Sequence, residues 1–149
     1  MGQKHRVLVI DDSALFRQLL AEIINSSPDL EVAASLGDPV EALELLKKTR
    51  FDVITLDVVM PKMDGLEFLQ RLMEFKPMPV VMISSWTQVS SKIGIKSLEL
   101  GAVDIIAKPQ ISYKEGIQLL KNEIITKLRT AVNIKVGLTF NRNSAPFAK

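Results

Sequence analysis

Four short apolar runs of this chain each end in side chains that could do chemistry. Asp11 and Asp12 follow the first run, Asp57 follows a later one, and Ser84 and Lys108 follow two more. Short continuous apolar runs are typical of buried strands, and open α/β sheets bind their ligands just outside the carboxyl ends of the strands. The spacing therefore predicts that three carboxylates, a hydroxyl and an ammonium group meet at one edge of a sheet.

Three carboxylates in a small space repel one another and raise each other's pKa unless a cation lies between them. A hard divalent ion with oxygen ligands fits such a site, and Mg²⁺ is the expected one. It would bridge a carboxylate and an incoming phosphoryl group. Asp57 is the natural nucleophile for an acyl phosphate, while Lys108 and the Ser84 hydroxyl could each contact a phosphoryl oxygen. Taken singly, each residue could be only a helix cap, a strand end or a surface lysine, but their coincidence favours function.

The rest of the chain alternates between strand and helix patterns. Strands are expected at residues 6–10, 31–36, 52–56, 79–83 and 103–107, and helices at 13–26, 38–48, 65–75, 88–100 and 113–131. Five strand–helix alternations require a parallel sheet with helices on both faces. The predicted fold is therefore α/β, a flavodoxin-like (βα)5 doubly wound parallel sheet with strand order 2-1-3-4-5.

Two features of the helices are also expected. The fourth helix begins with Ser90 and Ser91, which have poor helix propensity, so its start should be mobile. Apolar residues at helical spacing, among them Leu15, Phe16 and Phe75, are assigned to the core.

Composition excludes several classes of protein. No apolar run approaches the roughly 20 residues of a membrane span, no secretory signal opens the chain, and cysteine is absent, so a soluble, cytoplasmic protein is expected. Residues 1–120 carry 13 Lys and Arg against 16 Asp and Glu, whereas residues 121–149 carry 6 against Glu123 alone. Nucleic-acid binding requires clustered basic and aromatic residues, and the body of the chain lacks such clusters.

The motifs at the strand ends resemble those of the receiver domain of two-component response regulators. They are Ile10-Asp11-Asp12-Ser13, Leu56-Asp57, Met60-Pro61, Asp64-Gly65, Ile83-Ser84 and Lys108-Pro109. The resemblance covers about residues 5–131. It implies that a histidine kinase phosphorylates Asp57, and that Ser84 and Lys108 sense the phosphoryl group. It also implies a Mg²⁺ site made by Asp11, Asp12, Asp57 and the backbone carbonyl of Val59, and a cis peptide at Lys108-Pro109.

A narrower resemblance rests on longer stretches of sequence. Residues 12–17, 52–61, 82–87, 98–104 and 108–110 look like the receiver of the chemotaxis protein-glutamate methylesterase. In that family the receiver blocks a C-terminal hydrolase that demethylates glutamate methyl esters on chemoreceptors and deamidates glutamines. Phosphorylation relieves the block and creates a surface for chemoreceptor tails.

The hydrolase itself is not expected in this chain. A Gly-x-Ser-x-Gly nucleophile elbow is absent, and His5 is the only histidine, so no Ser-His-Asp triad can form. The predicted organisation is a receiver domain at residues 1–131 and an interdomain linker at 132–149, with the methylesterase domain outside this chain. The chain alone should catalyse only its own phosphotransfer and dephosphorylation.

Two alternatives and one departure from the family remain. The chain could be a stand-alone receiver that signals by binding a partner, or, in a different class, a Mg²⁺-dependent haloacid-dehalogenase-like phosphatase. The phosphatase requires Asp-x-Asp, and here the sequence is Asp57-Val58-Val59. Many receivers carry an aromatic residue where this chain has Ile105, so coupling through Trp86 and the weak start of the fourth helix is expected instead.

Overall fold

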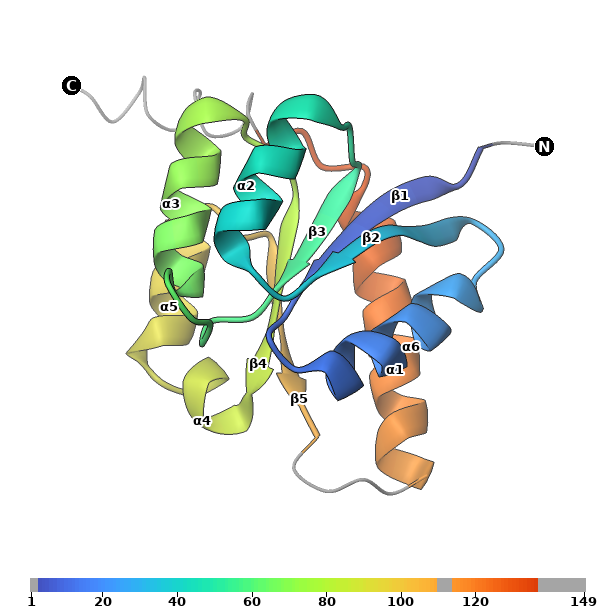
Figure 1. Ribbon diagram of the computed structural model, residues 1–149. Helices are drawn as coiled ribbons and strands as arrows, with labels where there is room; N and C mark the ends of the chain where they lie inside the picture. The colour runs from blue at the N-terminus through green and yellow to red at the C-terminus, as the bar shows by residue number, and fades with distance from the viewer. Residues whose placement is uncertain (1–2, 110–113, 137–149) are drawn as a thin grey trace.

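A parallel five-stranded sheet forms the centre of the computed structural model, which describes residues 3–109 and 114–136. Its strands are β1 (His5–Ile10), β2 (Leu30–Leu36), β3 (Val53–Leu56), β4 (Val80–Ser85) and β5 (Asp104–Lys108). They lie in the order β2-β1-β3-β4-β5, all parallel (Figure 1). This is the predicted strand order, and it places the carboxyl ends of β1 and β3 side by side.

Helices cover both faces of the sheet (Figure 1). The layer on one face consists of α1 (Ala14–Asn25) and α6 (Lys114–Ala131). The layer on the other face consists of α2 (Pro39–Lys48), α3 (Gly65–Phe75) and α5 (Lys92–Glu99), while the short α4 (Trp86–Val89) directly follows β4. Among the described helices, none combines the length and apolar character of a membrane span.

The strands are continuously apolar because they are buried on both faces. In β1, Val7 and Val9 belong to the core cluster under α1 and α6, whereas Leu8 and Ile10 belong to the cluster under α2 and α3. All four side chains are buried. Alternate residues thus supply two separate cores, as expected of a parallel strand between two helical layers.

Polar caps start three helices at the same edge of the sheet. The Ser13 hydroxyl accepts a hydrogen bond from the Phe16 amide at 3.2 Å. The carboxylates of Asp38 and Asp64 cap α2 and α3 in the same way. Each cap satisfies an amide that the helix leaves unpaired, so the loops after β1, β2 and β3 have defined ends.

The fourth predicted helix is wrong as a single element, because residues 86–99 form α4 and α5 with a break at Ser90 and Ser91. The Ser91 hydroxyl accepts from the Ile93 amide at 3.1 Å and donates to the Gln88 carbonyl at 2.8 Å. Serine side chains that bond nearby backbone compete with helical hydrogen bonds. The low propensity recognised in the sequence therefore produces a break.

Two apolar residues assigned to the core are exposed. The side chain of Leu15 is 78% exposed and that of Phe75 is 45% exposed, while Phe16 is half-buried. Leu15 lies in the first turn of α1 and Phe75 is the last residue of α3. Helix ends have less of the sheet to cover them, so the spacing that is correct for the middle of a helix fails at its ends.

The chain after α6 continues along the domain. Val136 is 6% exposed and belongs to the same core cluster as Phe51 and Met78, with Ile134 packed against that cluster. Figure 1 shows residues 132–136 at the end of the molecule away from α4. The first part of the predicted linker at 132–149 is therefore packed, and residues 137–149 lie outside the described part of the chain.

Candidate functional site

The loops after β1 and β3 bring three carboxylates together. One oxygen each from Asp11, Asp12 and Asp57 lies within 4.8 Å of the others. Asp11 and Asp57 are buried, at 2% and 7% exposed, whereas Asp12 is exposed. The cluster is thus a partly enclosed acidic site with one side open to solvent.

Ser84 fixes the Asp57 carboxylate from the end of β4. Its buried hydroxyl donates to Oδ1 of Asp57 at 2.6 Å and accepts from the Val58 amide at 2.8 Å. The hydroxyl therefore joins β4 to both the acidic side chain and the backbone that follows it. Because its proton and a lone pair are both used, Ser84 holds Asp57 in one orientation.

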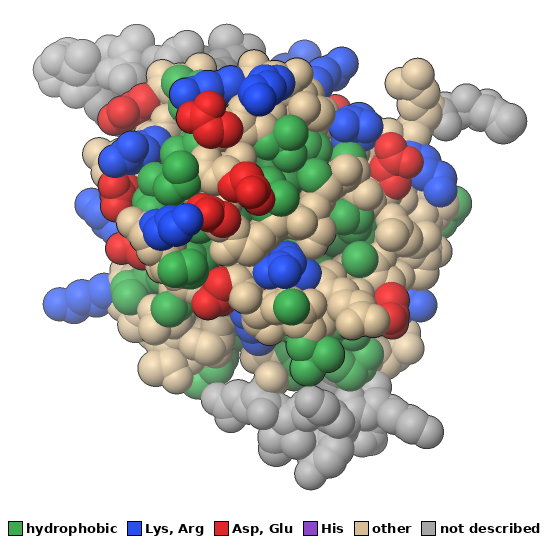
Figure 2. Space-filling model, viewed as in Figure 1, with side chains coloured by type: hydrophobic (Ala, Val, Ile, Leu, Met, Phe, Trp, Pro, Cys, Tyr) green, Lys and Arg blue, Asp and Glu red, His purple; other side chains and the backbone are tan. Residues whose placement is uncertain are grey.

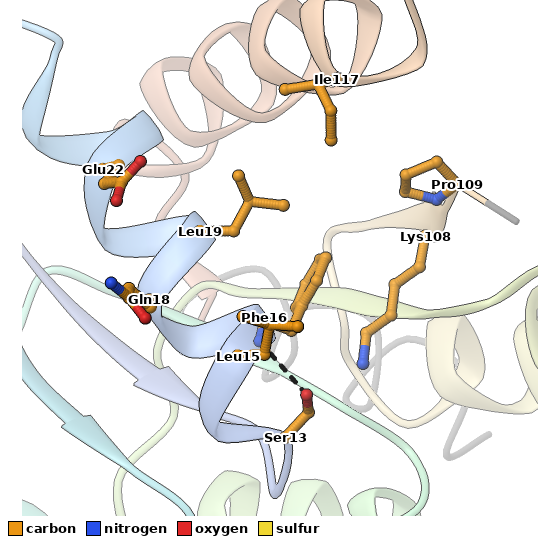
Figure 3. Close-up of a pocket in the computed structure, with 9 residues that line it drawn as sticks. All are labelled: Ser13, Leu15, Phe16, Gln18, Leu19, Glu22, Lys108, Pro109 and Ile117. Atoms are coloured by element: carbon orange, nitrogen blue, oxygen red, sulfur yellow. Dashed lines mark hydrogen bonds between the residues drawn. The ribbon is translucent and has the colours of Figure 1, made fainter. Parts of the chain in front are cut away.

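Lys108 closes the site from the end of β5. Its Nζ atom lies 2.8 Å from Oδ2 of Asp11 and 3.3 Å from Oδ2 of Asp57. The same ammonium group lies 4.4 Å from the centroid of the Phe16 ring, a cation–π contact. Figure 3 shows Phe16 projecting from α1 toward the lysine side chain, on the wall of a groove that also contains Leu19 and Ile117.

Burial and charge act against each other at Asp11. Burial raises the pKa of the Asp11 carboxyl above its ordinary value, and the nearby charge of Asp57 acts in the same direction. The hydrogen bonds from Lys108 and from the Ser13 amide oppose this rise. The Lys108 ammonium contacts two carboxylates of a cluster of three, so the cluster carries more negative charge than this lysine balances.

The donor set fits a hard divalent cation. The ligands that the site offers are carboxylate oxygens, and one side of the cluster is open, as an ion that keeps several waters requires. Sulfur and imidazole ligands, which zinc prefers, are absent from this cluster. Val59 follows the acidic residues with a 56% exposed side chain, and its carbonyl as a fourth ligand remains a prediction.

A close backbone contact shapes the loop between Asp57 and α3. The Gly65 amide donates to the Val58 carbonyl at 2.6 Å. A Cβ atom on Gly65 would lie 2.3 Å from the Asp57 carbonyl oxygen, nearer than side chains tolerate. Glycine is therefore required here by close approach of the backbone, a role that the Asp64-Gly65 motif did not reveal by itself.

Sequence reasoning missed several residues that support the site. Phe16 was assigned to the core but contacts Lys108, and Nη1 of Arg17 donates to the Asp11 carbonyl. Lys62, in the loop after Asp57, pairs with Asp38 at the start of α2. These partners come from different helices, strands and loops, so sequence spacing alone gives no indication that they meet.

One prediction from the resemblance is wrong. The described backbone contains no cis peptide bond, so Lys108-Pro109 is trans. The trans isomer is the intrinsically preferred one for bonds before proline. With this trans bond the lysine still contacts both Asp11 and Asp57.

Residues 7–121 match the model of the response regulator receiver domain. The chain belongs to this family. The family match also leaves the haloacid-dehalogenase-like phosphatase without support, since the site residues all lie within a receiver fold.

Two of the curated relatives that the chain matches carry the same enzyme name. The chain is 52% identical over 133 residues to a protein-glutamate methylesterase/protein-glutamine glutaminase of Yersinia pestis bv. Antiqua (strain Antiqua), covering 89% of this chain and 38% of that protein. It is 50% identical over 134 residues to the enzyme of the same name from Salmonella typhimurium, covering 90% and 38%. The chain thus spans little more than a third of the curated relatives that it matches.

A solved structure of similar length is also close. The response regulator domain of Thermotoga maritima CheB is 40% identical, with a TM-score of 0.81, covering 89% of this chain and 99% of that domain.

On the face of our receiver domain in Figure 2, acidic and basic side chains are interspersed over α2 and α3. No single basic patch dominates that face, in agreement with the charge distribution of the sequence.

Proposed function

We propose that this receiver domain is the phosphoacceptor unit of a chemotaxis response regulator and that Asp57 accepts a phosphoryl group from a histidine kinase. One observation carries the proposal. The Asp57 carboxylate lies between the Ser84 hydroxyl at 2.6 Å and the Lys108 ammonium at 3.3 Å, beside the carboxylate of Asp11. This arrangement leaves an anionic nucleophile oriented and partly neutralised.

The transfer follows from the roles of these groups. A carboxylate oxygen of Asp57 attacks the phosphorus of a phosphohistidine, and the phosphorus–nitrogen bond breaks as the new phosphorus–oxygen bond forms. The electron pair of the broken bond stays on the imidazole nitrogen. The Lys108 ammonium can follow the negative charge onto a phosphoryl oxygen, and the Ser84 hydroxyl can donate to another.

A divalent cation completes this proposal. Asp11, Asp12, Asp57 and the carbonyl of Val59 would hold Mg²⁺, which when bound supplies the positive charge that the three carboxylates lack. Lys108 already offsets part of that charge through its contacts with Asp11 and Asp57. Hydrolysis would end the cycle: water attacks the phosphorus, the bond between phosphorus and the Asp57 oxygen breaks, and inorganic phosphate leaves the free aspartate.

The output is proposed from the relatives. They are named protein-glutamate methylesterase/protein-glutamine glutaminase, and the chain covers 38% of their length. We infer that the receiver acts in the cytoplasm, regulates a C-terminal methylesterase domain, and through it modifies chemoreceptors. A receiver that signals by binding a separate partner is the alternative.

The acceptor role is tested by the intact mass of the chain after incubation with Mg²⁺ and a small phosphodonor. The parent should gain one phosphoryl group, and the Asp57→Asn variant and the metal-free parent should gain none. Equal uptake by the variant, or no uptake by a folded parent, would contradict the proposal. Transfer from a phosphorylated chemotaxis kinase, compared with an unrelated histidine kinase, tests the assignment to chemotaxis.

A further inference from the structure

An ion pair links two loops at the edge of the sheet that holds the acidic site. Nζ of Lys62, in the loop between β3 and α3, lies 2.7 Å from Oδ2 of Asp38, in the loop between β2 and α2. Neither residue belongs to the acidic cluster or contacts Ser84 or Lys108. Lys62 and Asp38 are 24 residues apart in the sequence, so no local pattern indicates this pair.

Asp38 is a rigid partner for this lysine. Its Oδ1 atom accepts from the amide of Val40 at 2.9 Å and so caps α2, which leaves Oδ2 for Lys62. The lysine lowers the pKa of the Asp38 carboxyl, and Asp38 raises the pKa of the Lys62 amine. The pair therefore stays charged across the neutral range, with one end fixed to a helix.

Lys62 holds an unfavourable backbone conformation. Its φ of 70° is the only positive φ of a non-glycine residue in the described chain. Such a conformation is disfavoured by roughly 1–2 kcal/mol for a side chain with a Cβ. The surrounding loop is tightly folded, with the Met63 amide donating to the Pro61 carbonyl at 2.7 Å and the Gly65 amide to that of Val58. A contact from outside the loop would stabilise this shape.

We propose that Asp38 and Lys62 are positioning residues that hold the backbone after Asp57, and with it the carbonyl of Val59, ready for the cation. This inference rests on the proposed function, because it assigns the Val59 carbonyl to the metal site. The pair fixes the loop at Lys62, three residues after Val59, to the start of α2. The opposite end of the loop is fixed by Ser84 through the Val58 amide.

A test of this role must leave the net charge near the cation site unchanged. Removing Lys62 alone would also remove a positive charge near a cation site, which would by itself favour metal binding. The double variant Asp38→Asn with Lys62→Asn keeps the net charge of the parent. Asparagine caps helices and tolerates a positive φ, so this variant removes the ion pair and keeps both local backbone roles.

The experiment measures amide hydrogen exchange of residues 58–65 without metal, and the Mg²⁺ dissociation constant by calorimetry. The double variant should exchange faster in this loop and bind Mg²⁺ about two- to fivefold more weakly, the range expected from an exposed ion pair. The difference should shrink at high salt, because salt screens exposed charges. A matched control removes the exposed Glu44–Lys47 pair of α2 by Glu44→Gln with Lys47→Gln and should change neither quantity.

Phosphoryl uptake by the parent, measured alongside, separates the two proposals. A parent that binds Mg²⁺ but takes up no phosphoryl group contradicts the proposed function and leaves the positioning role supported by the double variant. Equal Mg²⁺ affinity in parent and double variant overturns the positioning role, whether or not the loop exchanges faster. A parent that binds no Mg²⁺ overturns it as well.

Discussion

At the scale of single residues, the buried carboxylate of Asp11 lowers the free energy of unfolding of the domain. Burial raises the pKa of its carboxyl above the ordinary value of 3.8. As pH rises from that value, the unfolded chain releases the proton before the folded one does, so the free energy of unfolding falls until the folded pKa is passed. The ionised carboxylate therefore destabilises the metal-free domain at pH 7.

Replacing this carboxylate should stabilise the domain. We expect Asp11→Asn to raise the free energy of unfolding at pH 7 by about 0.5–2 kcal/mol, and by less as pH falls toward 4. Urea denaturation at several pH values without metal measures this. The same variant should bind Mg²⁺ more weakly. A stabilisation that does not depend on pH would show that the carboxylate charge is not its cause.

Gly65 gives a second prediction at this scale. Gly65→Ala should force the loop away from the Asp57 carbonyl, because the new Cβ would lie 2.3 Å from that oxygen. The expected loss is about 1–3 kcal/mol of unfolding free energy, together with slower phosphoryl uptake. Thermal denaturation and intact mass measure the two effects.

Gly37→Ala is the matched control for that change. Its Cβ would meet Nη1 of Arg17 at 2.6 Å, and that flexible side chain can move away with the loss of only its hydrogen bond to the Asp11 carbonyl. The control should therefore be destabilised less than Gly65→Ala. Equal losses in both variants would mean that the backbone at Asp57 adapts as easily as an arginine side chain.

At the scale of elements, the break between α4 and α5 depends on one hydroxyl. Ser91 caps α5 through the Ile93 amide and contacts the Gln88 carbonyl of α4. Ser91→Ala should destabilise α5 locally by about 0.5–2 kcal/mol, the usual effect of removing an N-cap. Amide hydrogen exchange over residues 92–99 should become faster by the corresponding factor.

Ser90→Ala provides the comparison. Ser90 ends α4 through its backbone amide, which the substitution keeps. Unchanged exchange of α5 in Ser90→Ala is expected, and equal acceleration in both variants would argue against the capping role of Ser91. The site of this break matters because Ile105 of β5 lies against Gly94 of α5. Transmission through Trp86 and α4, rather than an aromatic switch, remains a prediction.

At the scale of the whole molecule, the periodicity of the sequence predicted the strands and the edge of the sheet that they share, because these features depend on local pattern. The continuous runs that became β1 and β3 are buried on both faces, so their ends had to share an edge, and Asp11 met Asp57. What failed depends on contacts between distant segments. Leu15 is exposed although it lies at the spacing of the apolar residues of its helix. The ion pair of Lys62 with Asp38 joins residues that are 24 positions apart in the sequence. No local pattern encodes such a contact.

One more contact between distant segments bears on where the receiver domain ends. The expected end of the receiver is residue 131, and Val136 is buried in the cluster that also contains Phe51 and Met78. Val136→Ala should lower the free energy of unfolding by about 1–2 kcal/mol, because it removes buried apolar surface. The exposed neighbour Lys135→Ala should have little effect. Urea denaturation compares them, and a Val136→Ala variant as stable as the parent would return the boundary to the end of α6.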